Sequence, residues 1–231
     1  SNLRKRLADY VMDEIGSADN LMKSDDYHKH MSITGSVERS LDNIDLEAME
    51  RQADREKEIG FGGADLIAID APKKTTIMNS VAEFNWQEIK GVDKYTIHIT
   101  DRFEREVLTK EIDQNSFSVN FYDYNLDKDV YYFWYVSVSG KPVIKSEEFA
   151  FRLMTDSEVE KVQAEVHGVL ESFGDNISPA ENIMLAAFYQ EKGLFNEALQ
   201  SYKRATDALP DVEAYAKLYS VFQYKMKSGN Y

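Results

Sequence analysis

The sequence predicts a multidomain α and β fold, with N-terminal helices, an antiparallel β-sandwich and a C-terminal array of short paired helices. Two changes in hydrophobic periodicity carry this prediction. Apolar residues recur at every second position from about residue 77, and they return to helical spacing after residue 154. We therefore expect three segments: a helical or irregular segment over 1–72, the sandwich over 73–154 and the helical domain over 155–231.

The composition excludes several classes of function. The 231-residue chain has a formal net charge of −14, which argues against binding nucleic acid or anionic membrane surfaces through charge. It has no cysteine, which excludes disulfides, thiol catalysis and cysteine-based zinc sites. No apolar run approaches the ~20 residues of a membrane span. Ser1-Asn2 has the form of a scar left by tag removal, so our hypothesis is that a leader or membrane anchor preceded Leu3.

The N-terminal third predicts two helices separated by polar chain. Residues 3–15 carry an amphipathic pattern that Gly16 should end, and residues 45–59 combine strong helix formers with a narrow apolar stripe. Two motifs here resemble sites. Asp25–His30 has two histidines but no third ligand nearby, and Gly60–Gly63 lacks the Lys-Ser/Thr of a phosphate-binding loop. We interpret them as a solvated polar loop and a linker or turn.

Between about residues 77 and 153, alternating residues predict six or seven short strands, which favours a sandwich. These residues resemble a fibronectin type III or immunoglobulin-like domain. Trp86 ends an early strand, Tyr95 opens the next, and Leu126 precedes Tyr132 by six positions, the spacing of the tyrosine corner. The short connection from Trp86 to Tyr95 suits compact bacterial variants. The resemblance implies a core that contains Tyr132, Trp134, Val136 and Val138.

The opposite face of the same strand carries Tyr131, Phe133 and Tyr135, with Tyr122 and Tyr124 nearby. If exposed, these rings form an aromatic platform for sugar rings or a peptide strand. Alternatively, another element covers them, and we favour this second hypothesis because large exposed apolar patches are rare. Their solvent accessibility decides between the two.

The C-terminal region holds the most specific pattern. Residues 155–173 predict a helix with a capping box from Thr155 to Glu158. Ser178 and Glu181 predict a second capping box, with Pro179 at the first helical position. Gly193 should end that helix, and a second helix should run from about residue 196 until Pro210.

Residues 178–210 resemble a tetratricopeptide repeat (TPR). The positions that carry the resemblance are Leu185, Ala186, Tyr189, Gly193, Ala198, Tyr202, Ala205 and Pro210, whereas Asn182 stands where the repeat often has Trp. A further helix over 211–225 begins where the next repeat would, so the array has about one and a half units. Either this helix caps the hairpin or the hairpin leans on the rest of the chain, and the two are compatible.

The resemblance implies a concave, mostly apolar partner-binding surface on the first helix of each unit. Its positions here are Ala180, Ile183, Ala187, Gln190 and Glu191, followed by Ala214, Lys217, Val221 and Tyr224. The Lys and Asn of the family's carboxylate clamp are absent at Ile183 and Ala187. We therefore expect a helix or apolar segment in the groove rather than a peptide C-terminus.

No catalytic set is visible. The four histidines, His28, His30, His98 and His167, lie in no nucleophile or metalloprotease motif, so we expect no enzymatic activity, no cofactor and no metal. The two modules together resemble bacterial cell-envelope proteins. We expect a non-enzymatic protein–protein interaction or scaffold protein in the periplasm or envelope, with the cytoplasm still open. The alternatives are a carbohydrate-binding module that uses the aromatic platform and the extracytoplasmic sensor part of a membrane-anchored, anti-sigma-type regulator.

Overall fold

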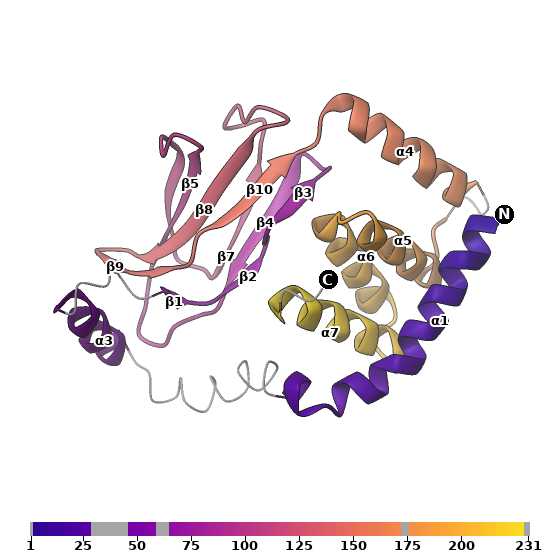
Figure 1. Cartoon of the computed structure of the whole chain (residues 1–231), viewed down its shortest axis with the longest axis horizontal. Coiled ribbons are helices and arrows are strands. Elements are labelled where there is room, and N and C mark those ends of the chain that lie inside the picture. The colour runs from indigo at the N-terminus through magenta and orange to yellow at the C-terminus, as the bar shows by residue number, and fades with distance from the viewer. Residues whose placement is uncertain (1, 29–45, 59–64, 172–175, 229–231) are drawn as a thin grey trace. The chain divides into compact units, whose positions relative to one another are not determined.

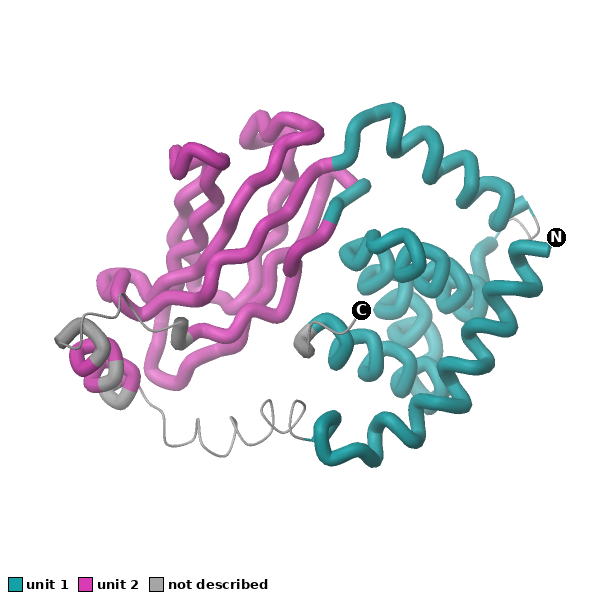
Figure 2. Tube along the Cα trace, in the orientation of Figure 1, with its two compact units in different colours: residues 1–31, 76–78, 154–231 teal, residues 32–75, 79–153 magenta. Residues whose placement is uncertain are grey.

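The computed structural model describes residues 2–28, 46–58, 65–171 and 176–228. The chain is a mixed α and β protein with β-sheets, an N-terminal helix and several C-terminal helices, as predicted at this level. It divides into two compact units (Figure 2). Residues 1–31, 76–78 and 154–231 form the helical unit, and residues 32–75 and 79–153 form the β unit. Among the described residues, none of the helices has the length and apolar character needed to span a membrane.

The strands build two sheets. A seven-stranded sheet has the order β1-β9-β8-β10-β3, with β5 beside β8 and β6 beside β5, and a three-stranded sheet has the order β2-β4-β7. Strand β1 runs parallel to β9, whereas β8 pairs antiparallel with β5, β9 and β10. The strands are β1 (Asp65–Ile67), β2 (Ile69–Ala71), β3 (Thr75–Ile77), β4 (Val81–Trp86), β5 (Tyr95–Asp101), β6 (Glu106–Ile112), β7 (Ser116–Asn120), β8 (Tyr131–Val138), β9 (Lys141–Ser146) and β10 (Phe149–Leu153).

Side chains from both sheets share the core of the β unit. The ring of Phe84 on β4 meets Trp134 on β8 edge-on, with 4.7 Å between centroids, and lies 5.5 Å from Phe151 on β10. The alternation of β8 places Tyr132, Trp134, Val136 and Val138 inside, which confirms their predicted burial. The buried end of Tyr132 is satisfied because its hydroxyl oxygen accepts a hydrogen bond of 2.7 Å from the backbone N–H of Asp127.

The first helix is longer than the sequence predicts. Helix α1 spans Asn2–Met22, so Gly16 does not end it. A glycine inside a helix costs only about 0.5–1 kcal/mol relative to alanine. Packing of the next turn, where Ala18 is buried, offsets that cost. A further helical turn over residues 25–28 buries Tyr27, so the described part of the predicted polar loop is not solvated throughout. Lys29, His30 and Gly60–Gly63 lie outside the described residues.

The second N-terminal helix belongs to the β unit. Helix α3 spans Leu46–Glu58 and contacts β9. Met49 and Ala53 of its predicted apolar stripe are buried. The ammonium of Lys141 pairs with the carboxylate of Glu50, which ties α3 to the start of β9.

Four more helices complete the helical unit: α4 (Asp156–Leu170), α5 (Pro179–Glu191), α6 (Phe195–Ala208) and α7 (Glu213–Ser228). Both predicted capping boxes are confirmed, at Thr155–Glu158 and at Ser178–Glu181. Gly193 follows α5 with φ of 70°, a value that glycine adopts without steric cost, so this predicted stop is also confirmed. The predicted helix over 211–225 is α7.

The core of the helical unit lies where α5 and α6 pack together. Ala186 on α5 and Ala198 on α6 are fully buried, and small residues let two helices approach closely. Helix α7 packs on α6, where the rings of Phe222 and Tyr202 are 5.1 Å apart. Helix α1 contacts both α5 and α7 (Figure 1). Helices α5 and α7 are therefore both in contact with the first helix of the chain.

Candidate interaction surfaces

The first candidate surface is the face of α5 and α7 that meets α1, which we call the α1 surface. Of the predicted groove residues, Gln190, Glu191 and Lys217 bond to α1, and Ile183 and Ala187 share a hydrophobic cluster with Leu7. Gln190, Lys217 and Ala214 are half-buried, and Ala180 and Glu191 are exposed. The remaining four, Ile183, Ala187, Val221 and Tyr224, are buried. The structure thus places part of the predicted groove against α1.

Apolar contact holds α1 on this surface. Leu7 is fully buried in the same hydrophobic cluster as Ile183 and Ala187, and Leu3, Val11 and Ile15 pack around that cluster partly buried. At about 20–33 cal/mol per Å² of apolar area, a fully buried leucine stabilises the contact by roughly 1.5–3 kcal/mol. Leu7 is therefore the main apolar anchor of α1.

A chain of polar groups lies beside Leu7. The side-chain amide of Gln190 donates to the hydroxyl of Tyr10 at 3.2 Å, and the hydroxyl of Tyr202 donates to the Gln190 carbonyl at 3.1 Å. Burial, with smaller effects from Glu14 and Glu191, raises the pKa of Tyr10 to about 12. Burial also raises the pKa of Tyr202. Both phenols therefore stay protonated at neutral pH and act as hydrogen-bonding groups.

Ion pairs flank the apolar contact in a defined order. Near the start of α1, Arg6 pairs with Glu191 at 2.9 Å and Arg4 approaches Glu181 at 4.0 Å, both on α5. Farther along, the acidic residues of α1 meet lysines of α7. The two pairs are Glu14 with Lys225 at 2.8 Å and Asp19 with Lys217 at 2.6 Å.

Lys217 is the most strongly paired of these cations. It lies 2.6 Å from Asp19 and 2.8 Å from Glu213 of its own helix. Hydrogen bonds to Asp19 and Glu213 raise the pKa of Lys217 to about 12, and the bond with Lys217 lowers the pKa of Asp19. Tyr224 on α7 contacts the residues that follow α1. Its hydroxyl donates a hydrogen bond to Asp26, and its ring lies 5.2 Å from that of Tyr27.

Sequence reasoning predicted a partner-binding groove on these helices and did not predict that residues 2–22 would contact them. The signal for this contact was the apolar stripe of residues 3–15, which matches a helix that lies on an apolar surface. Nothing in that stripe says which surface it meets. The partner helices α5 and α7 lie more than 150 residues later in the chain.

The second candidate surface is the aromatic row Tyr131, Phe133 and Tyr135 on the outer face of β8. Tyr131 is 58% exposed, so the favoured expectation that another element covers this face is wrong at that residue. Phe133 and Tyr135 are half-buried. Tyr135 already has aromatic and cationic neighbours, because His98 stacks on it at 4.5 Å and the Lys145 ammonium lies 5.6 Å from its centroid. The exposed part of the row is therefore Tyr131.

His98, which stacks on Tyr135, also lies close to a serine and a glutamate. Its Nε2 lies 3.1 Å from the Ser137 hydroxyl, and its Nδ1 lies 3.8 Å from Glu106 Oε1. Burial lowers the pKa of His98, and Glu106 opposes that shift. The order resembles a Ser-His-acid triad, but 3.8 Å is too long for a hydrogen bond and Ser137 is only 3% exposed. We therefore interpret this group as a structural network of the sheet.

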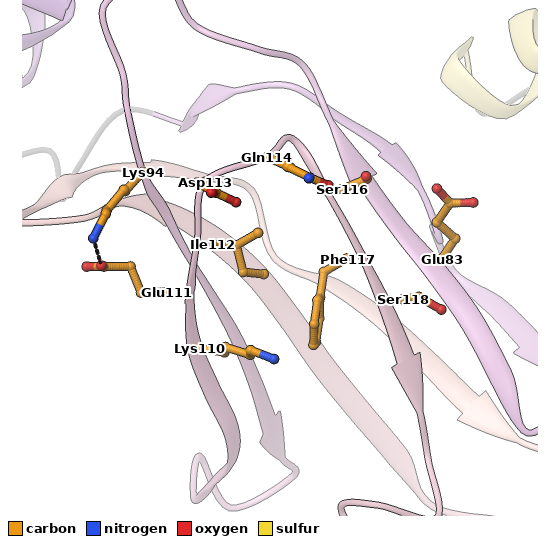
Figure 3. Close-up of a pocket in the computed structure, with 10 residues that line it drawn as sticks. All are labelled: Glu83, Lys94, Lys110, Glu111, Ile112, Asp113, Gln114, Ser116, Phe117 and Ser118. Atoms are coloured by element: carbon orange, nitrogen blue, oxygen red, sulfur yellow. Dashed lines mark hydrogen bonds and ion pairs between the residues drawn. The ribbon is translucent and has the colours of Figure 1, made fainter.

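The β unit also has an open hollow of about 610 Å³ beside β6 and β7 (Figure 3). Its charges pair locally. Lys94 and Glu111 lie 2.6 Å apart, and the Lys110 ammonium lies 4.5 Å from the centroid of the Phe117 ring. Its lining is completed by Glu83, Ile112, Asp113, Gln114, Ser116 and Ser118. No buried acid–base pair converges here, so the hollow offers no reaction centre that we recognise.

The remaining predicted features have simple positions. His167 is an exposed residue of α4, 3.1 Å from Glu171, which confirms its expected surface position. His28 is exposed on the helical turn that follows α1. Within the described part of the chain, no group of three or more His, Asp or Glu side chains is placed to hold a metal ion.

Comparison with known proteins finds a structural likeness for part of the chain. No protein-family model matches the sequence, and no curated protein matches it. Among solved structures, an Fn3-like protein from Clostridium thermocellum is similar to part of this chain at 12% sequence identity and a TM-score of 0.28. The alignment covers 39% of this chain and 96% of the other.

Proposed function

We propose that this chain is a non-enzymatic protein–protein interaction protein whose α1 surface binds an amphipathic helix. One observation carries the proposal: the surface already holds a helix, α1, through buried Leu7 and flanking ion pairs. Docking of an amphipathic helix into an apolar groove is a common mode of peptide recognition. In this proposal α1 occupies the site in the same chain and competes with an outside partner.

We assign the helical unit to a TPR-like array of about one and a half repeats. The burial of Ala186, Ala198 and Tyr202 supports this assignment, as does the positive φ of Gly193. Such short arrays need additional contacts for stability. Helix α1 supplies such contacts to α5 and α7.

We assign the β unit to a β-sandwich of the fibronectin type III kind. The contact of Phe84 with Trp134 supports two facing sheets, and the hydrogen bond from Asp127 to Tyr132 matches a tyrosine corner. By the resemblance of this pair of modules to bacterial envelope proteins, we place the protein in the periplasm or cell envelope. Cell fractionation of the native host with an antibody tests this location, and an exclusively cytoplasmic signal would contradict it.

A peptide-binding measurement tests the helix-binding proposal. The probe is a fluorescein-labelled peptide of residues 2–28, and the receptor is the full chain carrying Leu7→Ala, which weakens the competing helix. We expect saturable binding by fluorescence anisotropy, and no binding of a matched peptide with Leu7→Asp. If the native peptide does not bind a folded receptor, the α1 surface is not a helix-binding site.

The exposure of Tyr131 favours carbohydrate binding as a second candidate function. An exposed ring on a sheet face can stack on a sugar ring. Affinity electrophoresis in gels that contain soluble polysaccharides tests it. Tyr131→Ala should abolish retardation, whereas Tyr122→Ala, which alters an exposed tyrosine outside the row, should leave it unchanged. Equal mobility of the wild-type chain with and without each polysaccharide would count against this function.

A further inference from the structure

The way α1 is held differs from the way the core helices are held. Only Leu7 and Ala18 are buried among the 21 residues of α1, whereas seven of the 13 residues of α5 are buried. Around Leu7 the contact combines partly buried apolar side chains with charged side chains that remain partly exposed. An apolar centre with a polar rim is typical of an interface between proteins rather than of a domain core. Helix α1 is therefore docked on the unit as a ligand would be.

The charges of this interface have a direction. The arginines at the start of α1 face glutamates of α5, and the acids later in α1 face lysines of α7. From Arg6 to Asp19 the helix advances about 20 Å at 1.5 Å per residue. A helix docked in the opposite direction would bring its acids to Glu181 and Glu191, and its arginines to Lys217 and Lys225. Like charges placed together across an interface disfavour the wrong partner or orientation.

We propose that the α1 surface selects a separate partner helix by charge order, with basic residues in the first two turns and acidic residues in the second half. This inference rests on the proposed function, because it requires that the surface accept an outside helix. The partner shares with α1 an apolar residue at the position of Leu7, between the two charged regions. Helix α1 is its competitor within the chain and lowers its apparent affinity.

The lysines of α7 carry much of this selection. The chain as a whole is strongly acidic, with a net charge of −14, so it repels an acidic helix at long range. Lys217 and Lys225 are placed where such a helix meets the surface with its second half. A uniformly basic helix would meet these two lysines, and a uniformly acidic one would meet Glu181 and Glu191. Only the mixed order satisfies both ends.

The test compares two peptides of equal length and equal net charge on the same receptor. The native peptide of residues 2–28 is compared with one in which Arg4→Glu, Arg6→Glu, Glu14→Lys and Asp19→Lys reverse the charge order and leave the apolar stripe intact. Anisotropy is measured against the full Leu7→Ala chain at low ionic strength. We expect the native peptide to bind at least tenfold more tightly. A receptor that also carries Lys217→Glu and Lys225→Glu should lose this preference.

A second receptor variant keeps the test valid if Leu7→Ala unfolds the chain. The full chain with Arg6→Glu and Glu14→Lys keeps Leu7 and loosens α1 through charge alone, and circular dichroism establishes that each receptor is folded. Equal binding of both peptides would overturn the charge-order inference and leave helix binding intact. Failure of both peptides on both folded receptors would overturn the proposed function. A concentration-dependent dimer of the wild-type chain that the native peptide dissociates would make a second copy the occupant and overturn the assignment to a separate partner.

Discussion

The α1 surface and the aromatic row on β8 both carry apolar side chains, but they differ in whether another part of the chain covers them. The α1 surface was expected to bind a partner, and the first helix of the chain lies against it. The aromatic row was expected to be covered, and Tyr131 at its end is 58% exposed. The periodicity of a helix or strand defines which residues share a face. What covers that face depends on segments far away in the sequence.

The largest predicted effect on stability comes from the contact of α1 with the α1 surface. Leu7→Ala removes a fully buried leucine from the contact of α1 with the helical unit, and we expect it to lower the free energy of unfolding by about 2–5 kcal/mol. Met12→Ala is the matched control, because Met12 is 65% exposed on the same helix and should change it by less than about 0.5 kcal/mol. Urea denaturation measures both. Equal, small effects would show that α1 does not depend on this anchor.

The second largest predicted effect on stability concerns the packing of α6 on α5. Ala198→Leu adds bulk where α6 packs on α5 and should destabilise by about 1–3 kcal/mol through overpacking. Ala208→Leu, at the exposed end of the same helix, should leave the melting temperature nearly unchanged. If both variants melt like the wild type, the two helices do not cross closely at Ala198.

On the β unit, the two faces of one strand can be compared directly. Tyr132→Phe removes the acceptor of the part-buried hydrogen bond from the Asp127 backbone N–H and should cost about 0.5–1.5 kcal/mol. Tyr131→Phe removes the neighbouring hydroxyl from the exposed face and should cost almost nothing. Chemical denaturation of the two variants distinguishes inner from outer tyrosine. A reversed order of stabilities would contradict the assigned register of β8.

The sequence predicts what local chemistry determines. Ser178 and Glu181 cap α5, and Gly193 ends it, because these preferences depend on a few neighbouring backbone groups. Gly16 misled the prediction because packing beyond it outweighs a propensity of less than 1 kcal/mol. The order of charges on α1 was printed in the sequence, but its meaning depends on Lys217 and Lys225, about 200 positions away. Long-range pairing of this kind leaves no local signal.

The smallest predicted effect concerns pH and the outer face of the β unit. Burial holds the pKa of His98 below its usual value of about 6.5, so the folded state binds fewer protons there than the unfolded state does. The stability that neutral His98 contributes is fully present above about pH 6.5 and is lost as the pH falls below that value towards the folded pKa.

The wild type should therefore lose more stability than His98→Gln between pH 7.5 and 5.5, measured as the shift in melting temperature. Glu106→Gln should lose more stability than the wild type over the same pH range. The reason is that Glu106 favours the protonated imidazole and partly opposes the effect of burial on the pKa of His98. Parallel pH profiles for all three proteins would mean that His98 titrates as it does in the unfolded chain. In that case burial does not restrict protonation of His98, and the face that His98 on β5 shares with Tyr135 on β8 is more accessible to solvent than the stacking of these two rings indicates.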